Sequence, residues 1–121
     1  MAKLNEETKK IIAECGPALV ATASKQGKPN VSAKGSFRVL DDEHVVFVEG
    51  GRLYTLANLR ENPQLSAIVF DPVTRKGCRI WGKAEIVDSG DLFDSISEEF
   101  AAKGMEVKHL VKVAVEEVVN F

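Results

Sequence analysis

Short apolar runs separated by turn residues make up most of the chain after residue 17. Each run is rich in β-branched, aromatic or alternating apolar residues, a composition that favours strands. The runs cover residues 18–24, 30–40, 44–50, 64–71, 78–89 and 110–121. Because only a few turn-forming residues separate the first three runs, we expect these runs to pair as antiparallel hairpins.

Two segments follow a helical period instead. Residues 4–15 are amphipathic, with Asn5 as the expected N-cap and two glutamates in the first turn, where the helix dipole favours negative charge. Residues 51–62 place leucine and alanine on one side, and Pro63 follows, which ends a helix. Both segments are predicted to be short helices, and the first is expected to lie on a sheet.

The clearest helical period lies between residues 89 and 104. Apolar side chains recur every four positions from Leu92, and Ser89 or Asp91 is expected to cap the first turn. The whole pattern predicts a mainly β, α+β protein, with six or seven strands in an antiparallel barrel or half-open sheet and short flanking helices. Since no linker or repeat divides the chain, residues 1–121 are expected to form a single domain.

Composition and charge narrow the classes of function. Apolar residues make up 45% of the 121 residues and charged residues 28%, which excludes an intrinsically disordered chain. A net charge of -2 argues against a nucleic-acid-binding protein, which needs an excess of lysine and arginine on one surface. The charged N-terminal segment and the lack of a long apolar run predict a cytoplasmic protein with no membrane partner.

Cysteines and histidines offer no recognisable site. Cys15 and Cys78 are far apart in the sequence and lack metal-ligand spacing, so both are expected to be packed thiols. His44 and His109 lack the neighbouring residues of a hydrolytic triad or a zinc site. We therefore expect no metal site, and the sequence assigns no catalytic residue.

A basic stretch within residues 30–40 is the first candidate for chemistry. In an uninterrupted strand, Ser32, Lys34, Ser36 and Arg38 point to the same side. Hydroxyl and cationic donors together bind and neutralise a phosphate group, so this face is a candidate anion site. The alternative is an ordinary solvent-exposed strand face, and a bulge at Gly35 would shift the register and split the row of donors.

The glycine pair Gly50–Gly51, which leads into the second predicted helix, is another candidate. Glycines let a ligand approach the backbone closely, and Arg52 and Thr55 add donors at the start of the helix. Most such glycine pairs are only turns, and the spacing of a Walker loop is absent. We interpret the segment as a candidate phosphate cradle.

Trp81, the only tryptophan, is predicted to share a strand face with Arg79 and Lys83. Its ring, next to Gly82, suits a flat ligand ring or a partner subunit, and the alternative is a core or interface anchor. Together with Phe70 and the valine-rich last run, Trp81 provides more apolar surface than a small barrel needs for one core. This surplus favours a homodimer.

Four motifs occur in a fixed order along the chain. They read SAKGSFRVLDDEHVVFVEGG, LRENP, SAIVF and CRIWGKAEIV. In this order and spacing they resemble the pyridoxamine 5'-phosphate oxidase-like family of FMN-binding split barrels, most of all its small single-domain members. The resemblance extends from about residue 14 to residue 121. It implies a six-stranded antiparallel split β-barrel that forms a homodimer, with two FMN sites at the interface, each built from both chains.

The resemblance also implies which residues contact the cofactor. Residues 32–34 fall on a strand that runs beside the flavin ring and its phosphate arm in this family, and residues 48–49 fall on the next strand, near the ribityl chain. Residues 52–55, at the start of the following helix, fall where relatives bind the phosphate. Trp81 falls on a strand that lies close to the partner's flavin in relatives. The implied cofactor-binding residues are Ser32, Ala33, Lys34, Val48, Glu49, Arg52, Tyr54, Thr55, Asn58 and Trp81.

Tyr54 departs from the family's pattern, because many relatives have a lysine there that neutralises the phosphate. Arg52 or Lys34 would have to supply that charge. This departure favours a non-catalytic flavin-binding or sensor module as one alternative. The same fold with a deazaflavin or a haem is another, and for haem the axial ligand would be His44 or His109.

The leading hypothesis from the sequence is an FMN-dependent oxidoreductase or electron carrier, in which the flavin does the redox chemistry. True pyridoxamine phosphate oxidase activity is not expected. The full-length oxidases have an additional C-terminal segment that completes the binding site for pyridoxamine phosphate, and few residues remain in this chain for such a segment.

Overall fold

The computed structural model describes residues 2–50 and 53–121, in which helices interrupt a series of strands. The strands are β1 (Ala18–Ala23), β2 (Pro29–Lys34), β3 (Arg38–Asp41), β4 (His44–Glu49), β5 (Gln64–Phe70), β6 (Gly77–Val87) and β7 (His109–Asn120). The helices are α1 (Glu6–Glu14), α2 (Leu53–Glu61) and α3 (Asp91–Ala101).

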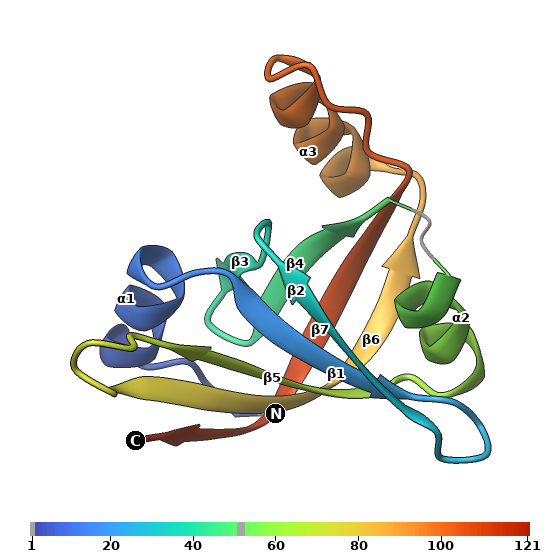
Figure 1. Ribbon diagram of the computed structural model, residues 1–121. Helices are drawn as coiled ribbons and strands as arrows, with labels where there is room; N and C mark the ends of the chain where they lie inside the picture. Colours follow the sequence, from blue (N-terminus) through green and yellow to red (C-terminus); the bar gives the residue numbers. More distant parts are fainter. Residues whose placement is uncertain (1, 51–52) are drawn as a thin grey trace.

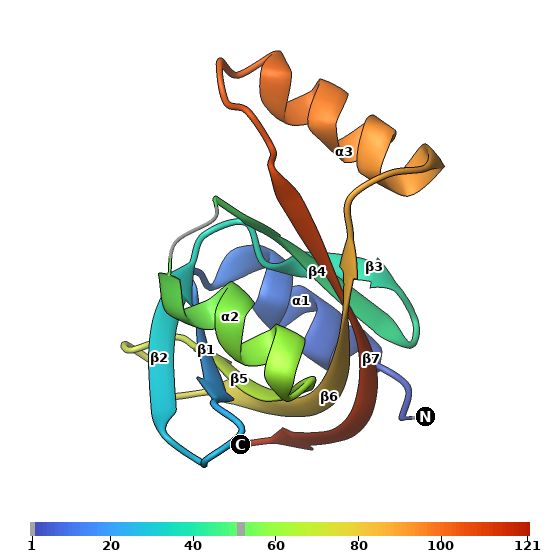
Figure 2. The same cartoon turned by 90° about the vertical axis from the view of Figure 1, so that its right-hand side faces the viewer.

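The strands form one curled sheet in the order β2-β1-β5-β6-β7-β4-β3, and every neighbouring pair is antiparallel. The sheet curls around α1 and α2, whereas α3 stands apart, beyond the ends of β6 and β7 (Figures 1 and 2). The predicted antiparallel split barrel with flanking helices is confirmed. The sheet has seven strands, rather than the six that the resemblance implied.

Alternate residues of neighbouring strands fill the interior of the barrel. Val45 and Phe47 of β4 lie opposite Val113 and Val111 of β7, and these side chains have no exposed surface. Ile80 of β6 is buried to the same extent. The period-two pattern of the apolar runs therefore corresponds to one inward-facing side of the sheet.

Residues 30–40, predicted as one strand, form two strands. β2 ends at Lys34 and pairs with β1, whereas β3 begins at Arg38 and pairs with β4. The turn after Lys34 therefore carries the chain from one edge strand of the sheet, β2, to the other, β3. The Ser36 hydroxyl accepts a hydrogen bond from the Val48 backbone N–H over 2.9 Å, which satisfies that N–H where the β3–β4 pairing has stopped.

The turn also separates the predicted row of donors. Ser32 and Lys34 remain on the same side of β2, but Ser36 lies in the turn. Arg38 pairs instead with Glu99 of α3, with 2.8 Å between Nη1 and Oε2. The prediction of four donors on one continuous strand face is therefore wrong.

The helix caps agree with the sequence at α1 and differ at α3. The Asn5 side chain accepts a hydrogen bond from the Thr8 N–H over 2.8 Å, as predicted. The cap of α3 is Gly90, with φ of 100° and no side-chain hydrogen bond, so the prediction of a Ser89 or Asp91 cap is wrong. Glycine readily adopts this positive φ, which lets the chain turn from β6 into the helix. None of the helices in the described residues is long and apolar enough to cross a membrane.

A small second cluster of apolar side chains joins α3 to the barrel. Ile96 of α3 packs with Val46 of β4 and Leu110 of β7, on the side of the sheet opposite to the main core. The main core and this cluster are separate. The position of α3 therefore depends on a limited apolar contact.

Both cysteines are free thiols. Cys78 has no exposed surface, and this burial raises the pKa of its thiol to about 11. Cys15, at the end of α1, is half-buried. Cys78 is thus a packed thiol, as expected from the sequence.

Candidate functional site

A cluster of polar side chains lies between α2 and the strands β1 and β2. The Thr55 hydroxyl lies 3.1 Å from the Ser32 hydroxyl, which also accepts a hydrogen bond from the Asn30 side chain over 3.2 Å. The Asn58 amide donates to the Thr22 hydroxyl over 3.1 Å. Thr22, Thr55 and Asn58 are buried. These hydrogen bonds fix the hydroxyl groups in place under the first turns of α2.

A buried ion pair lies next to this polar cluster. Lys34, two positions after Ser32 on the same side of β2, places its ammonium 2.6 Å from a carboxylate oxygen of Glu49. The Glu49 side chain is 1% exposed and that of Lys34 is 14% exposed. Since a buried charge is costly without a counter-charge, each of these residues stabilises the other. The positive charge of Lys34 is thus balanced within the chain.

A histidine lies next to the ion pair in the sheet. His109 of β7 is directly opposite Glu49 of β4, and its Nδ1 lies 2.7 Å from the Asp88 carboxylate. This contact occupies Nδ1 and fixes the orientation of the ring. A similar contact of 2.8 Å joins His44 to Asp41.

The structure brings one group of the predicted cofactor-binding residues together at this end of the barrel. They are Ser32, Lys34, Glu49, Thr55 and Asn58. The group joins two hydroxyls, an amide, an ammonium and a carboxylate, and all of them except the carboxylate are donors suited to phosphate or to polyol oxygens.

The other predicted residues lie elsewhere. Val48 packs in the apolar cluster under α3, and Ala33 and Trp81 lie on the outer side of the sheet. Tyr54 is exposed on α2. Arg52 lies outside the described residues.

Sequence reasoning missed Thr22, Asn30 and Asp88. Thr22 and Asn30 lie directly opposite each other in the β1–β2 hairpin. The hairpin register around the turn at residues 24–28 could have identified them. Asp88 reaches His109 only because β6 and β7 pair across a helix that separates them in the chain. No local pattern indicates such a contact.

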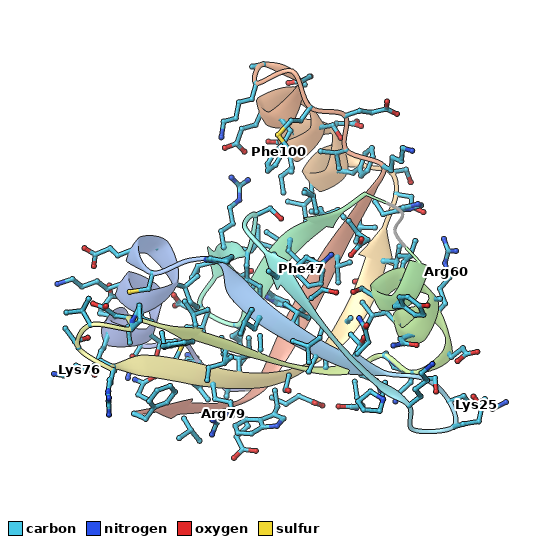
Figure 3. All side chains as sticks on the ribbon, viewed as in Figure 1. Lys25, Phe47, Arg60, Lys76, Arg79 and Phe100 are labelled. Atoms are coloured by element: carbon cyan, nitrogen blue, oxygen red, sulfur yellow. The ribbon has the colours of Figure 1, made fainter. Side chains whose placement is uncertain are left out.

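The outer side of the sheet is exposed and apolar. On this side, a row of paired residues crosses four strands, in the order Leu19, Ile68, Arg79 and Val119. The outer side chains form the lower surface of the molecule, where Arg79 is labelled in Figure 3. The exposed large apolar residues of this surface are Leu19, Val31, Phe70, Val119 and Phe121. We call this surface the outer face.

Comparisons of the sequence with known proteins add to this geometry. A family model described as pyridoxamine 5'-phosphate oxidase matches residues 4–120. An uncharacterised protein from Methanocaldococcus jannaschii is 40% identical over 68 residues, which cover 54% of this chain and 45% of that protein. The match thus spans less than half the length of this curated relative.

Solved structures show the same architecture. HupZ from Group A Streptococcus is 26% identical, with a TM-score of 0.91 over 98% of this chain and 94% of the other. An FMN-binding protein from Syntrophomonas wolfei is 16% identical, with a TM-score of 0.83 over 95% and 84%. The haem storage protein HutZ from Vibrio cholerae is 21% identical, with a TM-score of 0.76 over 97% and 94%. At their low identities, the last two show a shared fold alone.

Proposed function

The chain belongs to the pyridoxamine 5'-phosphate oxidase family, and from this premise we propose that it is a homodimeric FMN-binding protein that acts as a small oxidoreductase or electron carrier. The observation that carries the proposal is the pair of hydroxyls, Ser32 and Thr55, fixed beside Lys34 at the start of α2. Bound FMN would supply the electron transfer, and the protein would bind and orient it. The S. wolfei protein with this fold is described as FMN-binding, which supports the choice of cofactor.

The donor set fits the phosphate end of FMN. One hydroxyl of the Ser32–Thr55 pair donates to the other, which leaves one hydroxyl hydrogen for a ligand. The N-terminal end of a helix also favours an anion. Glu49 offsets part of the charge of Lys34, so the site is less positive than a free lysine would make it. Arg52, next to this turn in the sequence, is the proposed source of further positive charge.

A second copy of the chain would complete the site. Because β2 is an edge strand, a ligand along it reaches the inner side chains Ser32 and Lys34 and the outer side chain Ala33 together. Trp81 also lies on the outer face. If the outer faces of two copies pack together, Trp81 of one chain comes beside the cofactor held by the other. We place this dimer in the cytoplasm, since both cysteines are free, as expected in a reducing compartment.

We expect Thr55→Val to weaken FMN binding by about ten- to a hundredfold, because a hydrogen bond to a charged group contributes about 1.5–3 kcal/mol. Binding of riboflavin, which lacks the phosphate, should change little. Flavin fluorescence titration of the purified protein measures both constants. Thr74→Val is the matched control, because Thr74 is an exposed threonine in the loop between β5 and β6. Equal losses for the two flavins would contradict the phosphate assignment.

The absorption spectrum of the purified protein separates this proposal from the haem alternative. One observation favours haem: Asp88 holds His109 through Nδ1, as is typical of metal-ligating histidines, and leaves Nε2 for a ligand bond. HutZ, described as a haem storage protein, has the same fold. A Soret band that is lost in His109→Ala would favour haem. A flavin spectrum that stays unchanged on addition of reduced nicotinamides would favour a binding or sensor module.

Replacing Trp81 with alanine should weaken the dimer at least about tenfold, since buried aromatic anchors contribute about 2 kcal/mol or more to an interface. Sedimentation equilibrium of the flavin-free protein measures the dissociation constant. Val73→Ala, in an exposed loop beside the outer face, is the control and should leave the constant unchanged. A Trp81→Ala protein with the same dissociation constant as the original would contradict this interface.

A further inference from the structure

A hollow of about 460 Å³ lies between α3 and the loop of residues 102–108 that joins α3 to β7. Its lining is mostly apolar and includes Phe93, Ala101, Met105 and Val107. The hollow lies at the opposite end of the molecule from the outer face, as the labels of Phe100 on α3 and Arg79 on β6 show (Figure 3). A dimer that packs the two outer faces together therefore leaves this hollow exposed.

Backbone contacts hold Met105 in place at the edge of the hollow. The Met105 N–H donates to the Phe100 carbonyl over 3.0 Å, and the Gly104 N–H donates to the Ala101 carbonyl over 2.9 Å. Gly104 has a φ of 78°, the left-handed conformation that commonly ends a helix and lets the chain turn back. The Met105 side chain is 52% exposed. Because methionine adapts its shape to an apolar neighbour, this edge suits contact with another molecule.

Carboxylates border the hollow. Asp94 and Glu98 are exposed on α3, each three positions before a residue of the lining, and residues three apart are neighbours on a helix. Glu106 belongs to the lining itself. Within the described part of the chain, none of these three carboxylates pairs with a cation. The lysines of the loop, Lys103 and Lys108, do not line the hollow, so its border is acidic.

The lining also contains a polar group that the chain leaves unsatisfied. The Ser97 hydroxyl is buried, and it has no hydrogen-bond partner among the described residues. Such a group costs stability, and native proteins contain few of them. Rotation about the Cα–Cβ bond of a serine moves its hydroxyl among three positions, so a polar atom of a molecule in the hollow can pair with it. The hollow therefore suits a partner that supplies both apolar and polar atoms.

The hollow lies beside the end of the barrel that holds the proposed FMN site. Val48, directly before Glu49, packs in the apolar cluster under α3. Asp88 and His109, one before and one after α3 in the chain, are joined over 2.7 Å, and His109 is directly opposite Glu49 in the sheet. Both views of the ribbon show α3 at this end (Figures 1 and 2). A molecule docked on α3 therefore comes close to the proposed FMN site.

We propose that this hollow and its acidic border are the docking surface for an electron-transfer protein, which places one apolar side chain in the hollow and basic residues against Asp94 and Glu98. The inference rests on the proposed FMN-binding function, which gives such a partner its role. A nucleic acid or an anionic lipid surface is negative and would be repelled by the same carboxylates. Transient electron-transfer complexes have small interfaces, which one helix and a short loop can provide.

Amide NMR spectra of the full chain, titrated with reduced cytochrome c, test the proposal. This probe is a basic electron-transfer protein. We expect the signals of α3 and of residues 102–107 to shift, those of the outer face to stay unchanged, and the binding to weaken at high salt. The double change Asp94→Asn with Glu98→Gln should weaken binding at least about threefold, and Met105→Ala at least about fivefold.

The matched control is the double change Glu7→Gln with Glu14→Gln. It removes two exposed carboxylates from α1 and should leave the binding of cytochrome c unchanged. All the substituted residues are exposed, so every variant should keep the thermal midpoint of the original protein.

Shifts on another surface, no shifts at all, or undiminished binding by Met105→Ala would each overturn the proposal, because the hollow would then receive no side chain. If Met105→Ala changes the mass of the protein alone in sedimentation, the hollow belongs instead to a contact between copies of the chain. The flavin titration tests the proposed function separately. A protein that binds FMN but not cytochrome c would contradict the docking surface alone. A protein that binds cytochrome c at α3 but no FMN would contradict the proposed function alone.

Discussion

Replacing Lys34 with methionine should lower the free energy of unfolding by about 3–5 kcal/mol, because removal of one partner leaves a buried charge uncompensated. The Glu49 carboxylate is 1% exposed and the Lys34 ammonium lies 2.6 Å from it. Without Lys34, the carboxylate stays in the barrel with neither water nor a cation from β2 beside it. Urea unfolding followed by Trp81 fluorescence measures the loss.

A second variant distinguishes the ion pair from simple packing by Lys34. The double change Lys34→Met with Glu49→Gln removes both charges and keeps the volumes similar, so most of the lost stability should return. Lys25→Met, in the exposed turn between β1 and β2 (Figure 3), is the matched control, and its effect should stay within about 0.5 kcal/mol. A loss below about 1 kcal/mol in Lys34→Met would mean that the pair behaves as a surface salt bridge.

Phe47→Ala should lower the free energy of unfolding by about 3–5 kcal/mol as well, by opening a cavity in the core. Phe47 has no exposed surface, and its ring stacks on that of Phe37 with 6.2 Å between the centres. The Lys34 ammonium lies 6.0 Å from the centre of the Phe47 ring, so the cavity would also disturb the ion pair.

Urea unfolding again measures this loss, with Tyr54→Ala as the control. Tyr54 is an exposed aromatic residue, so its truncation should change stability by no more than about 0.5 kcal/mol. A similar loss in the free energy of unfolding for Phe47→Ala and Tyr54→Ala would contradict the position of Phe47 in the core.

Local patterns predicted much of the fold. The alternation that buries Val45 and Phe47 and the cap at Asn5 are each encoded within a few residues. Gly35 indicated that the strand could be interrupted after Lys34, but the apolar alternation continues through Gly35 to Val39 and gives no sign of a change of pairing partner. β2 and β3 separate there because they pair with different strands, and such long-range pairing leaves no local trace.

In the candidate site, too, local features were predictable and long-range contacts were not. Ser32 and Thr55 were identifiable because hydroxyls beside lysine and glycines are typical of phosphate sites, and the structure joins them over 3.1 Å. The pairing of Lys34 with Glu49 was not identifiable, since β2 and β4 are not neighbours in the sheet. This ion pair changes the interpretation of Lys34, from a free cation to one that is already neutralised.

The separate cluster under α3 gives the molecule two levels of local stability. α3 buries Ile96 against the barrel, whereas β4 and β7 are buried along their inner sides and paired along their length. This small cluster and the Arg38–Glu99 ion pair hold α3 against the barrel, so α3 should unfold locally while the barrel stays closed. The amide hydrogens of α3 would then exchange with solvent through this local opening, and those of β4 and β7 only when the whole barrel unfolds.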